Sequence, residues 1–226
     1  CNMLTVHSLC WLCQMPLAIS RWGVCSRCAR TLFNTQPRCP QCGLPAAIGH
    51  VVCGRCLRKA PPWSRLIAVN DYVPPLSHLI HEFKFCDKPE LAPILARLML
   101  LNARQTSGLP RPDRLISVPL WQRRHWRRGF NQSDLLCQAL AKWLGCAWHP
   151  FALKRVRKTA TQHQLSARLR ARNLKNAFRL ELPVKGLHMV IVDDVVTTGS
   201  TVAEISRLLL RNGAASVQVW CLCRTL

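Results

Sequence analysis

The sequence predicts an α/β protein in which a parallel sheet flanked by helices follows a small cysteine-rich module. Two observations support this prediction. Four C-x-x-C pairs lie within the first sixty residues, and beyond them short apolar runs alternate with segments whose apolar residues recur at helical spacing. Strands that alternate with helices are typical of a parallel sheet covered by helices. We therefore assign residues 1–60 to the cysteine-rich module and residues 61–226 to the α/β domain.

The cysteine pattern indicates metal binding. Eight of the fourteen cysteines form the four pairs, with eleven, ten and ten residues between successive pairs. A C-x-x-C turn directs two thiolates at one point, as tetrahedral zinc requires. Four regular pairs are too many for a redox motif and argue against a disulfide framework. The eight predicted ligands, enough for the two structural Zn²⁺ ions of a double zinc ribbon, are Cys10, Cys13, Cys25, Cys28, Cys39, Cys42, Cys53 and Cys56.

The spacing leaves two groupings of these ligands open. Consecutive pairing would place the first four cysteines on one ion and the last four on the other, while an interleaved arrangement satisfies the same count. Two Zn²⁺ ions with eight thiolates lower the formal charge from +22 to about +18. The other cysteines stand in largely apolar contexts and are expected to be reduced thiols. Reduced thiols beside zinc sites favour a reducing compartment, so we expect a cytoplasmic protein.

The elements of the α/β domain follow a stiff Ala-Pro-Pro linker at residues 60–62. Apolar periodicity predicts each of them, and glycines at positions 145 and 213 mark the ends of two helices. The predicted strands lie at residues 66–73, 115–119, 190–192 and 216–223. The predicted helices lie at residues 75–85, 90–104, 131–144 and 201–211.

The stretch HMVIVDDVVTTGST, residues 188–201, is the most informative motif. A strand leading into Asp193 and Asp194 is followed by a loop of hydroxyl residues and glycine that opens a helix. Ligands of open α/β sheets bind outside the C-terminal strand ends, and backbone N–H groups at a helix N-terminus hold phosphate. The predicted phosphate-binding residues are Thr197, Thr198, Gly199, Ser200 and Thr201. The adjacent carboxylates cannot serve that phosphate, so we expect them to bind sugar hydroxyls; a capped helix after a core strand would not explain them.

The charge distribution favours a polyanionic partner. The chain has 24 Arg and 8 Lys against 10 acidic residues, and residues 1–70 contain no carboxylate. In WQRRHWRR, residues 121–128, arginines alternate with aromatic rings, which suits single-stranded nucleic acid because phosphates contact guanidinium groups and bases stack on rings. The predicted nucleic-acid-binding residues are Trp121, Arg123, Arg124, Trp126, Arg127 and Arg128. In the alternative interpretation, the tryptophans pack in the core while the arginines bind only diphosphate.

These motifs together resemble a known family. VIVDDVVTTGST is similar to the 5-phosphoribosyl 1-diphosphate (PRPP) loop of type I phosphoribosyltransferases, and this likeness implies a type I phosphoribosyltransferase-like fold. The double zinc ribbon and the segment VPLWQRRHWRRGFNQ, residues 118–132, narrow the resemblance to the ComF/GntX family, proteins of bacterial competence and extracellular DNA utilisation. A later segment contributes Arg155, Thr159, Gln162, Leu165, Arg170, Asn173 and Phe178 to the resemblance.

The resemblance implies how PRPP would bind. Asp193 and Asp194 would contact the ribose hydroxyls, and residues 197–201 would hold the 5′-phosphate. Residues 118–129 would take the place of the diphosphate-binding loop, and residues 155–166 that of the flexible loop that closes over the site. Mg²⁺ would be bridged by the diphosphate and ribose, with few protein ligands of its own.

Two functions follow from the resemblance. One is a protein of DNA uptake and utilisation that binds single-stranded DNA and PRPP and allows extracellular DNA to serve as a nutrient. The other is a catalytic phosphoribosyltransferase acting on a nucleobase or nucleotide fragment, in which Asp193 and Asp194 stabilise positive charge at the ribose and Arg155 or Lys158 neutralises the leaving diphosphate. No segment is predicted to form a nucleobase-binding hood, which favours the first.

Membrane association is expected only through partners. No run approaches the ~18 uncharged apolar residues of a membrane-spanning helix, so we expect no transmembrane segment. The first twenty residues lack a basic leading segment and a small-residue cleavage site, so we expect no targeting segment either. The resemblance implies DNA-translocation machinery at the inner face of the membrane as a candidate partner.

Overall fold

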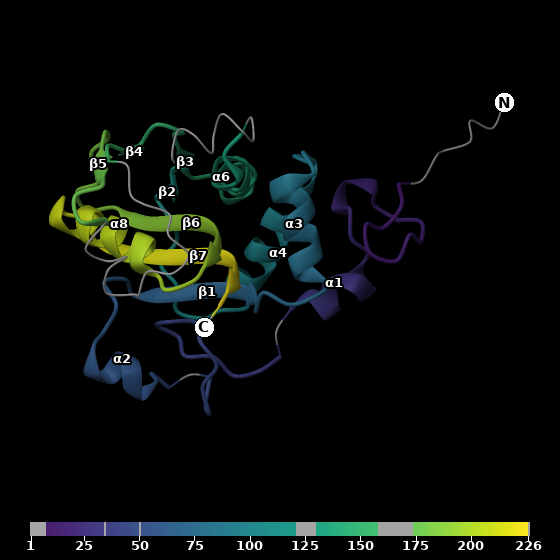
Figure 1. Ribbon diagram of the computed structural model, residues 1–226, viewed down its shortest axis with the longest axis horizontal. Coiled ribbons are helices and arrows are strands. Elements are labelled where there is room, and N and C mark those ends of the chain that lie inside the picture. Colours follow the sequence, from purple (N-terminus) through teal and green to yellow (C-terminus); the bar gives the residue numbers. More distant parts are fainter. Residues whose placement is uncertain (1–7, 34, 50, 121–129, 158–173, 226) are drawn as a thin grey trace.

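A five-stranded parallel sheet forms the centre of the molecule (Figure 1). The computed structural model describes residues 8–33, 35–49, 51–120, 130–157 and 174–225. The strand order is β1-β7-β6-β2-β3, and every neighbouring pair is parallel. The strands are β1 (Arg65–Asn70), β2 (Arg114–Ser117), β3 (Ala147–Trp148), β6 (His188–Val196) and β7 (Ser216–Arg224).

Helices cover both faces of this sheet. The helices α3 (Leu76–Phe85), α4 (Leu91–Arg104) and α6 (Gln132–Leu144) share one core with one face of the strands. The other face packs against α8 (Ser200–Arg211) and an antiparallel hairpin of β4 (Leu153–Arg155) and β5 (Phe178–Leu180). In β6, Val190 and Val192 belong to the first core and Met189 and Ile191 to the second, as the alternation of a strand requires.

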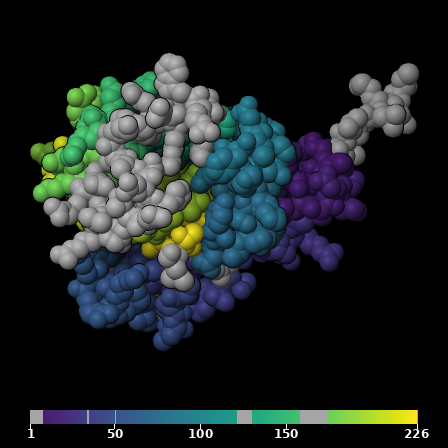
Figure 2. Space-filling view, viewed as in Figure 1, coloured from purple at the N-terminus to yellow at the C-terminus, as the bar shows by residue number. Residues whose placement is uncertain are grey.

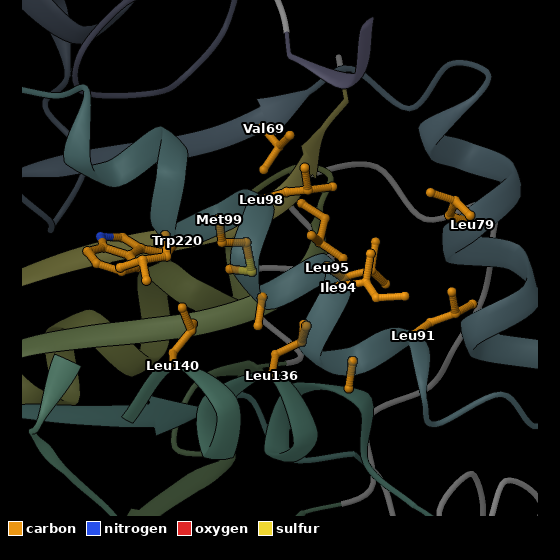
Figure 3. Close-up of a cluster of buried hydrophobic side chains, with 14 of the residues drawn as sticks. Val69, Leu79, Leu91, Ile94, Leu95, Leu98, Met99, Leu136, Leu140 and Trp220 are labelled. Atoms are coloured by element: carbon orange, nitrogen blue, oxygen red, sulfur yellow. The ribbon is translucent and has the colours of Figure 1, made fainter. Parts of the chain in front are cut away.

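Helix α4 is apolar around most of its surface because it has neighbours on several sides. It contacts β1, α6 and α3, and its leucines fill the space between these elements (Figure 3). Leu91 and Leu95 are fully buried, and Leu98 and Met99 nearly so. Burial of each such side chain contributes about 1.5–3 kcal/mol relative to exposure. The part of the chain that the structure describes contains no helix long and apolar enough to cross a membrane.

The cysteine-rich segment lies against one edge of the sheet and one end of α4. It contains η1 (Ser20–Trp22), α1 (Ser26–Leu32) and α2 (Gly54–Arg58). Leu32 of α1 is buried in the same core as α3 and α4, and the Arg97 guanidinium stacks 4.1 Å from the ring centre of Trp22. Figure 2 shows this purple segment beside the blue residues of α3 and α4.

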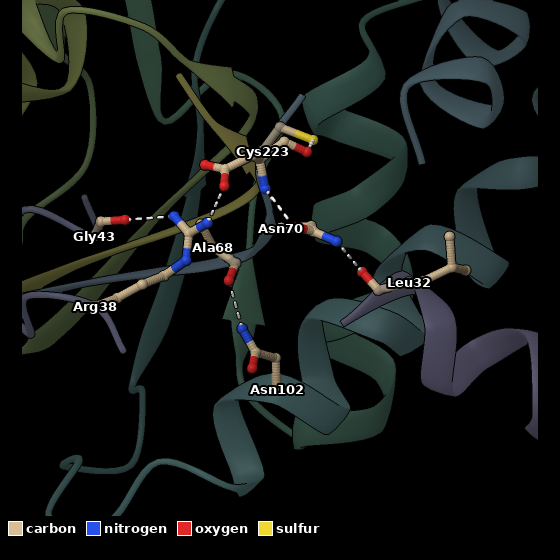
Figure 4. Close-up of polar contacts among 8 residues, drawn as sticks. Leu32, Arg38, Gly43, Ala68, Asn70, Asn102 and Cys223 are labelled. Carbon is tan, nitrogen blue, oxygen red and sulfur yellow. Dashed lines mark hydrogen bonds and ion pairs between the residues drawn. The ribbon is translucent and has the colours of Figure 1, made fainter. Parts of the chain in front are cut away.

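Polar contacts attach the same segment to the end of β1 (Figure 4). The Asn70 side-chain amide donates to the Leu32 carbonyl at 3.0 Å. The Arg38 guanidinium pairs with Asp71 at 2.7 Å and also donates to the carbonyl of Gly43 at 2.7 Å. These contacts hold the cysteine-rich segment close to the C-terminal edge of the sheet, where ligands of parallel sheets bind.

The predicted α/β class is confirmed, with differences in detail. The first strand ends at Asn70 rather than at residue 73, because the chain turns towards Pro74 and Pro75, which cannot donate to a strand ladder. The strand expected at 190–192 runs from 188 to 196, so both acids lie within it. Strand β3 and the β4–β5 hairpin were not predicted, since segments of two or three residues show no periodicity.

Candidate functional site

The eight predicted metal ligands form two compact groups. One contains Cys10, Cys13, Cys25 and Cys28, and the other contains Cys39, Cys42, Cys53 and Cys56. Within each group all four sulfur atoms lie within 4.8 Å of one another. Of the two groupings that the spacing left open, the structure therefore has the consecutive one.

The sulfur geometry of both groups fits tetrahedral zinc. Zn–S bonds of about 2.3 Å in a tetrahedron place two sulfur atoms about 3.8 Å apart. The Sγ atoms of Cys13 and Cys25 are 3.8 Å apart, and those of Cys42 and Cys53 are 3.7 Å apart. Backbone N–H groups also point at the sulfurs, from Cys25 to Cys10 at 3.4 Å and from Cys53 to Cys39 at 3.3 Å.

These N–H groups prepare one thiol in each group to bind a metal as thiolate. Burial alone would raise the pKa of the Cys10 thiol, but hydrogen bonds from backbone N–H groups lower the pKa to about 6. The same balance lowers the pKa of Cys39 to about 7. In contrast, burial and the neighbouring thiols raise the pKa of Cys28 and Cys56. A divalent cation is needed before all four sulfurs of a group can be deprotonated together.

The hydroxyl-rich loop connects β6 to α8 at the C-terminal edge of the sheet. Gly199 caps α8 with φ of 75°, a left-handed conformation that side chains disfavour. The Thr198 and Ser200 hydroxyls lie 3.0 Å apart, and the first turn of α8 contains no acidic residue. The first N–H groups of a helix have no partner within the helix, so this turn presents donors to an anion. An open pocket here is lined by Asp193 and by residues 195–202.

Asp193 lines this pocket, whereas its neighbour Asp194 is not among the lining residues and has different surroundings. Asp194 forms an ion pair with Lys84 of α3, with 3.0 Å between Nζ and Oδ2, and the two side chains are 15% and 16% exposed. The Ser133 hydroxyl, on α6, donates to Asp193 at 3.4 Å. Burial, and then the charge of Asp194, raise the pKa of Asp193 to about 8, although Lys84 opposes the shift.

The two acids therefore differ as hydrogen-bonding groups. The raised pKa of Asp193 favours its neutral carboxyl, which offers a donor and an acceptor, while Asp194 is held by the Lys84 ammonium. Such a set can bind two adjacent hydroxyl groups. A neutral Asp193 also repels a nearby phosphate less than an ordinary carboxylate would.

Sequence reasoning missed Lys84 and Ser133. Both stand near or inside predicted helices, but nothing local distinguishes Lys84 from a surface lysine. Its partner Asp194 lies on a different element far along the chain. The serine had a weak signal, since it stands in the polar run Asn131-Gln132-Ser133 at the start of α6, and the structure shows all three residues to be buried. Buried polar residues at a strand-to-helix edge often face a site.

Of the remaining predicted site residues, the structure describes only Arg155. Arg155 lies in β4, with its guanidinium 5.8 Å from the ring centre of Phe178 in β5. The structure does not bring Arg155 into the pocket lined by residues 193 and 195–202. The predicted residues outside the described ranges are Lys158, Trp121, Arg123, Arg124, Trp126, Arg127 and Arg128.

Comparison with known proteins gives relatives along nearly the full chain. The family model described as "Phosphoribosyl transferase domain" matches residues 135–226. The DNA utilization protein YhgH of Salmonella typhi is 71% identical over 227 residues, covering 99% of this chain and 100% of that protein. Competence protein F of Haemophilus influenzae is 42% identical, covering 95% and 96%. Competence protein ComFC of Bacillus subtilis is 28% identical, covering 89% and 84%. The similarity thus includes the cysteine-rich segment as well as the sheet.

Proposed function

Because the chain belongs to the ComF/GntX family of DNA utilization and competence proteins and carries a phosphoribosyltransferase domain, we propose that it binds PRPP and single-stranded DNA and serves in the use of extracellular DNA as a nutrient. The observation that carries the proposal is the pocket at the end of β6. It combines a hydroxyl-rich helix N-terminus with Asp193, whose raised pKa favours the neutral carboxyl, and Asp194 follows directly in the strand.

PRPP fits this pocket by its chemistry. Its 5′-phosphate matches the N–H groups and hydroxyls of residues 197–201, and its ribose hydroxyls match Asp193 and Asp194. The diphosphate brings Mg²⁺ with it, which adds positive charge where Asp194 is already paired with Lys84. In the free protein Lys84 neutralises Asp194, so binding of the magnesium complex requires that this ion pair be rearranged or shared.

Single-stranded DNA is the second proposed ligand. The net charge of +22 supports it, as does the composition of residues 121–128, where four arginines alternate with two tryptophans. Residues 154–175 add eight basic residues without an acid. Lys154 at the start of this segment pairs with Glu181 at 3.6 Å, while most of the segment lies outside the described ranges. We further propose a cytoplasmic location and DNA-translocation machinery at the inner membrane face as a partner.

Two structural Zn²⁺ ions are proposed for the tetracysteine groups, on the sulfur distances given above. A bound zinc ion supplies no reaction chemistry there, because four thiolates leave it no open position. Its contribution is to fix the fold of a segment whose own hydrophobic cluster is small, formed by Leu44 and three of the cysteines.

A catalytic phosphoribosyltransferase is the second candidate. In that reaction the bond between the anomeric carbon and diphosphate breaks, diphosphate leaves with the electron pair, and an acceptor atom forms the new bond. Asp194 would stabilise the positive charge that develops on the ribose. The placement of Asp193 in the pocket favours this candidate, whereas the sequence predicts no nucleobase-binding hood.

One titration separates these proposals. Purified full-length protein is titrated with PRPP and Mg²⁺ by calorimetry, and with labelled single-stranded DNA in the presence and absence of PRPP, while diphosphate release is assayed. Binding of both ligands without diphosphate release supports the binding function. Release that depends on an added base supports the enzyme. If the protein binds DNA but not PRPP, the proposed role of the pocket as a PRPP site is wrong.

A further inference from the structure

The last strand of the sheet ends in a buried arginine that joins two distant segments. The Arg224 side chain is only 5% exposed. Its Nε donates to the carbonyl of Cys42 at 3.0 Å, and its Nη1 donates to the carbonyls of Val196, at 3.1 Å, and of Thr197. Cys42 is a ligand of the second tetracysteine group, and residues 196–197 begin the phosphate-binding loop. The Arg224 side chain therefore connects the second tetracysteine group with the phosphate-binding loop.

A tryptophan makes a second bridge between the same segments. Trp63 is 8% exposed, and its indole N–H donates to the carbonyl of Gln41 at 2.6 Å. The far end of its ring lies under the loop, because a Cβ placed on Gly199 would be 3.2 Å from Trp63 Cη2. Gln41 lies within the Cys39–Cys42 turn. Two successive carbonyls of that turn thus accept hydrogen bonds from side chains that support the loop.

The first tetracysteine group has no comparable bridge among the described residues. Its segment packs through Leu17, Val24 and Leu32 into the core of α3 and α4. Trp22 there stacks with Arg97 of α4 rather than with the loop. The two metal groups therefore have different neighbours, one next to a helical core and the other next to the anion-binding loop. Figure 1 shows the C-terminus beside the segment that carries α2, in agreement with the contacts of Arg224.

The guanidinium of Arg224 makes this bridge stiff. A buried charge is costly unless it is hydrogen-bonded, and here Nε and Nη1 donate to carbonyls of the Cys39–Cys42 turn, of residues 196–197 and of the adjacent Thr225. A shift of the Cys39–Cys42 turn would leave Nε without the Cys42 carbonyl. A shift of the loop would leave Nη1 without the carbonyls of residues 196 and 197. The preferred positions of turn and loop are therefore linked.

We propose that Arg224 and Trp63 are positioning residues that brace the phosphate-binding loop on the second metal site, so that metal at Cys39, Cys42, Cys53 and Cys56 and a phosphate-bearing ligand at residues 197–201 bind cooperatively. The inference rests on the proposed function, because it takes PRPP as the ligand of the loop. Coupling between sites is reciprocal: if the metal strengthens PRPP binding by a certain factor, PRPP strengthens metal binding by the same factor.

The test measures this coupling factor as the change in zinc affinity that PRPP causes. The full-length zinc-loaded protein competes at equilibrium with a chromophoric chelator, with and without PRPP and Mg²⁺. In the wild type we expect saturating PRPP to raise the affinity of one zinc about fivefold or more and to leave the other unchanged. Trp63→Phe, which removes the N–H donor to Gln41 and is too short to reach below Gly199 as Cη2 does, should reduce the factor towards one while two zinc ions remain bound. The matched control, Trp22→Phe beside the first group, should keep the wild-type factor.

Arg224→Met is the stronger variant, and it is read by amide hydrogen exchange as well. Faster exchange at residues 196–201, with two zinc ions retained, is expected from the loss of the brace. If this variant does not fold, the comparison of Trp63→Phe with Trp22→Phe still tests the coupling between the metal site and the loop.

The possible failures can be told apart. If the wild type binds PRPP but neither zinc affinity changes, the inference is overturned and the proposed function stands. If the wild type does not bind PRPP, the proposed function fails. In that case amide hydrogen exchange still tests whether Arg224 and Trp63 hold the loop in place. Unchanged exchange at residues 196–201 in both Arg224→Met and Trp63→Phe would overturn this positioning role.

Discussion

The ammonium group of Lys84 lies 3.0 Å from a carboxylate oxygen of Asp194, and both side chains are largely buried. This pair explains how two adjacent acids can stand at the end of β6. Lys84 compensates the charge of Asp194 and counteracts, in part, the rise in the pKa of Asp193. A residue of α3 thereby influences the pKa of Asp193, which lines the pocket at the end of β6.

Removal of this cation should destabilise the protein. In Lys84→Met the carboxylate of Asp194 loses its partner in a mostly buried position, and we expect the free energy of unfolding at pH 7 to fall by about 2 kcal/mol. Urea denaturation measures the loss. The double variant Lys84→Met/Asp194→Asn should recover part of it, because the unpaired charge is then gone.

Lys154→Met is the matched control for Lys84. Its pair with Glu181 is longer, at 3.6 Å, and the lysine side chain is 50% exposed. Such pairs contribute about 0.5 kcal/mol or less. Equal losses in the two variants would show that the Lys84–Asp194 pair is worth no more than a surface contact.

The raised pKa of Asp193 predicts a pH-dependent gain for Asp193→Asn. The folded-state pKa is about 8, while an aspartate in an unfolded chain has a pKa of about 3.9. The contribution of this group to stability is thus complete below about pH 4 and is lost as the pH rises to about 8. Asparagine cannot ionise and keeps its contribution. The midpoint of thermal unfolding of Asp193→Asn should therefore rise relative to the wild type between pH 5 and pH 9; a constant difference over this range contradicts the shift.

Gly199 and Gly186 have nearly the same backbone conformation, so alanine substitutions at the two positions distinguish the cost of backbone strain from an effect on ligand binding. Gly199 and Gly186 have φ of 75° and 76°, so alanine at either position costs about 1–2 kcal/mol of backbone strain. Only at Gly199 would the new Cβ approach a neighbour, Trp63, whereas nothing lies within 4 Å at Gly186. We expect Gly199→Ala to weaken PRPP binding at least tenfold by calorimetry and Gly186→Ala to leave it unchanged.

The metal content should follow the two tetracysteine groups. Elemental analysis of protein purified without chelator should find two zinc ions per chain, and Cys39→Ser should retain about one. Cys146 lies outside both groups, so Cys146→Ser should retain two zinc ions per chain. A content near zero, with disulfides found by mass spectrometry, would rule out the zinc assignment.

The arginine-rich segment predicts a salt signature for DNA binding. Replacing Arg123, Arg124, Arg127 and Arg128 by alanine should weaken single-stranded DNA binding and reduce the slope of log affinity against log salt by up to about 3. Trp126→Ala should cost about 1–3 kcal/mol of binding free energy with the slope nearly unchanged, because stacking is not ionic.

A control on α8 tests whether the salt signature is specific. Arg207 and Arg211 both pair with Glu204 there. Their replacement should leave the slope close to that of the wild type. If the four-arginine variant binds DNA like the wild type at every salt concentration, residues 121–128 are not the DNA site.

The sequence allowed prediction of those features that depend on local patterns. The apolar period located α3, α4, α6 and α8 to within one residue at both ends. The cysteine spacing identified eight residues that the structure brings together in two groups. The DDVVTTGST motif identified the pocket, because strand end, loop and helix start are consecutive in the chain.

Features that depend on distant contacts could not be predicted. Arg224 stands at the end of an apolar strand and would be expected to reach solvent, yet its partners are carbonyls of residues 42, 196, 197 and 225. A carbonyl acceptor leaves no trace in the sequence, because every residue has one. Lys84 was missed for a related reason, since its environment is formed by β6 and not by its own helix.

The order of strands has a consequence for synthesis of the chain. β1 pairs with β7 alone among the strands of the sheet, through residues 65–70 and 218–223, so the first strand to leave the ribosome is paired by the last. Throughout translation β1 carries an unpaired strand edge, a site where chains can associate wrongly. The cysteine-rich segment is complete before β1 emerges, and it already holds β1 through Asn70 and through the bond from Leu66 N–H to the Pro40 carbonyl, 3.2 Å long. We expect the cysteine-rich segment to hold the outer edge of β1 during synthesis, while the edge that pairs with β7 stays open until β7 is made.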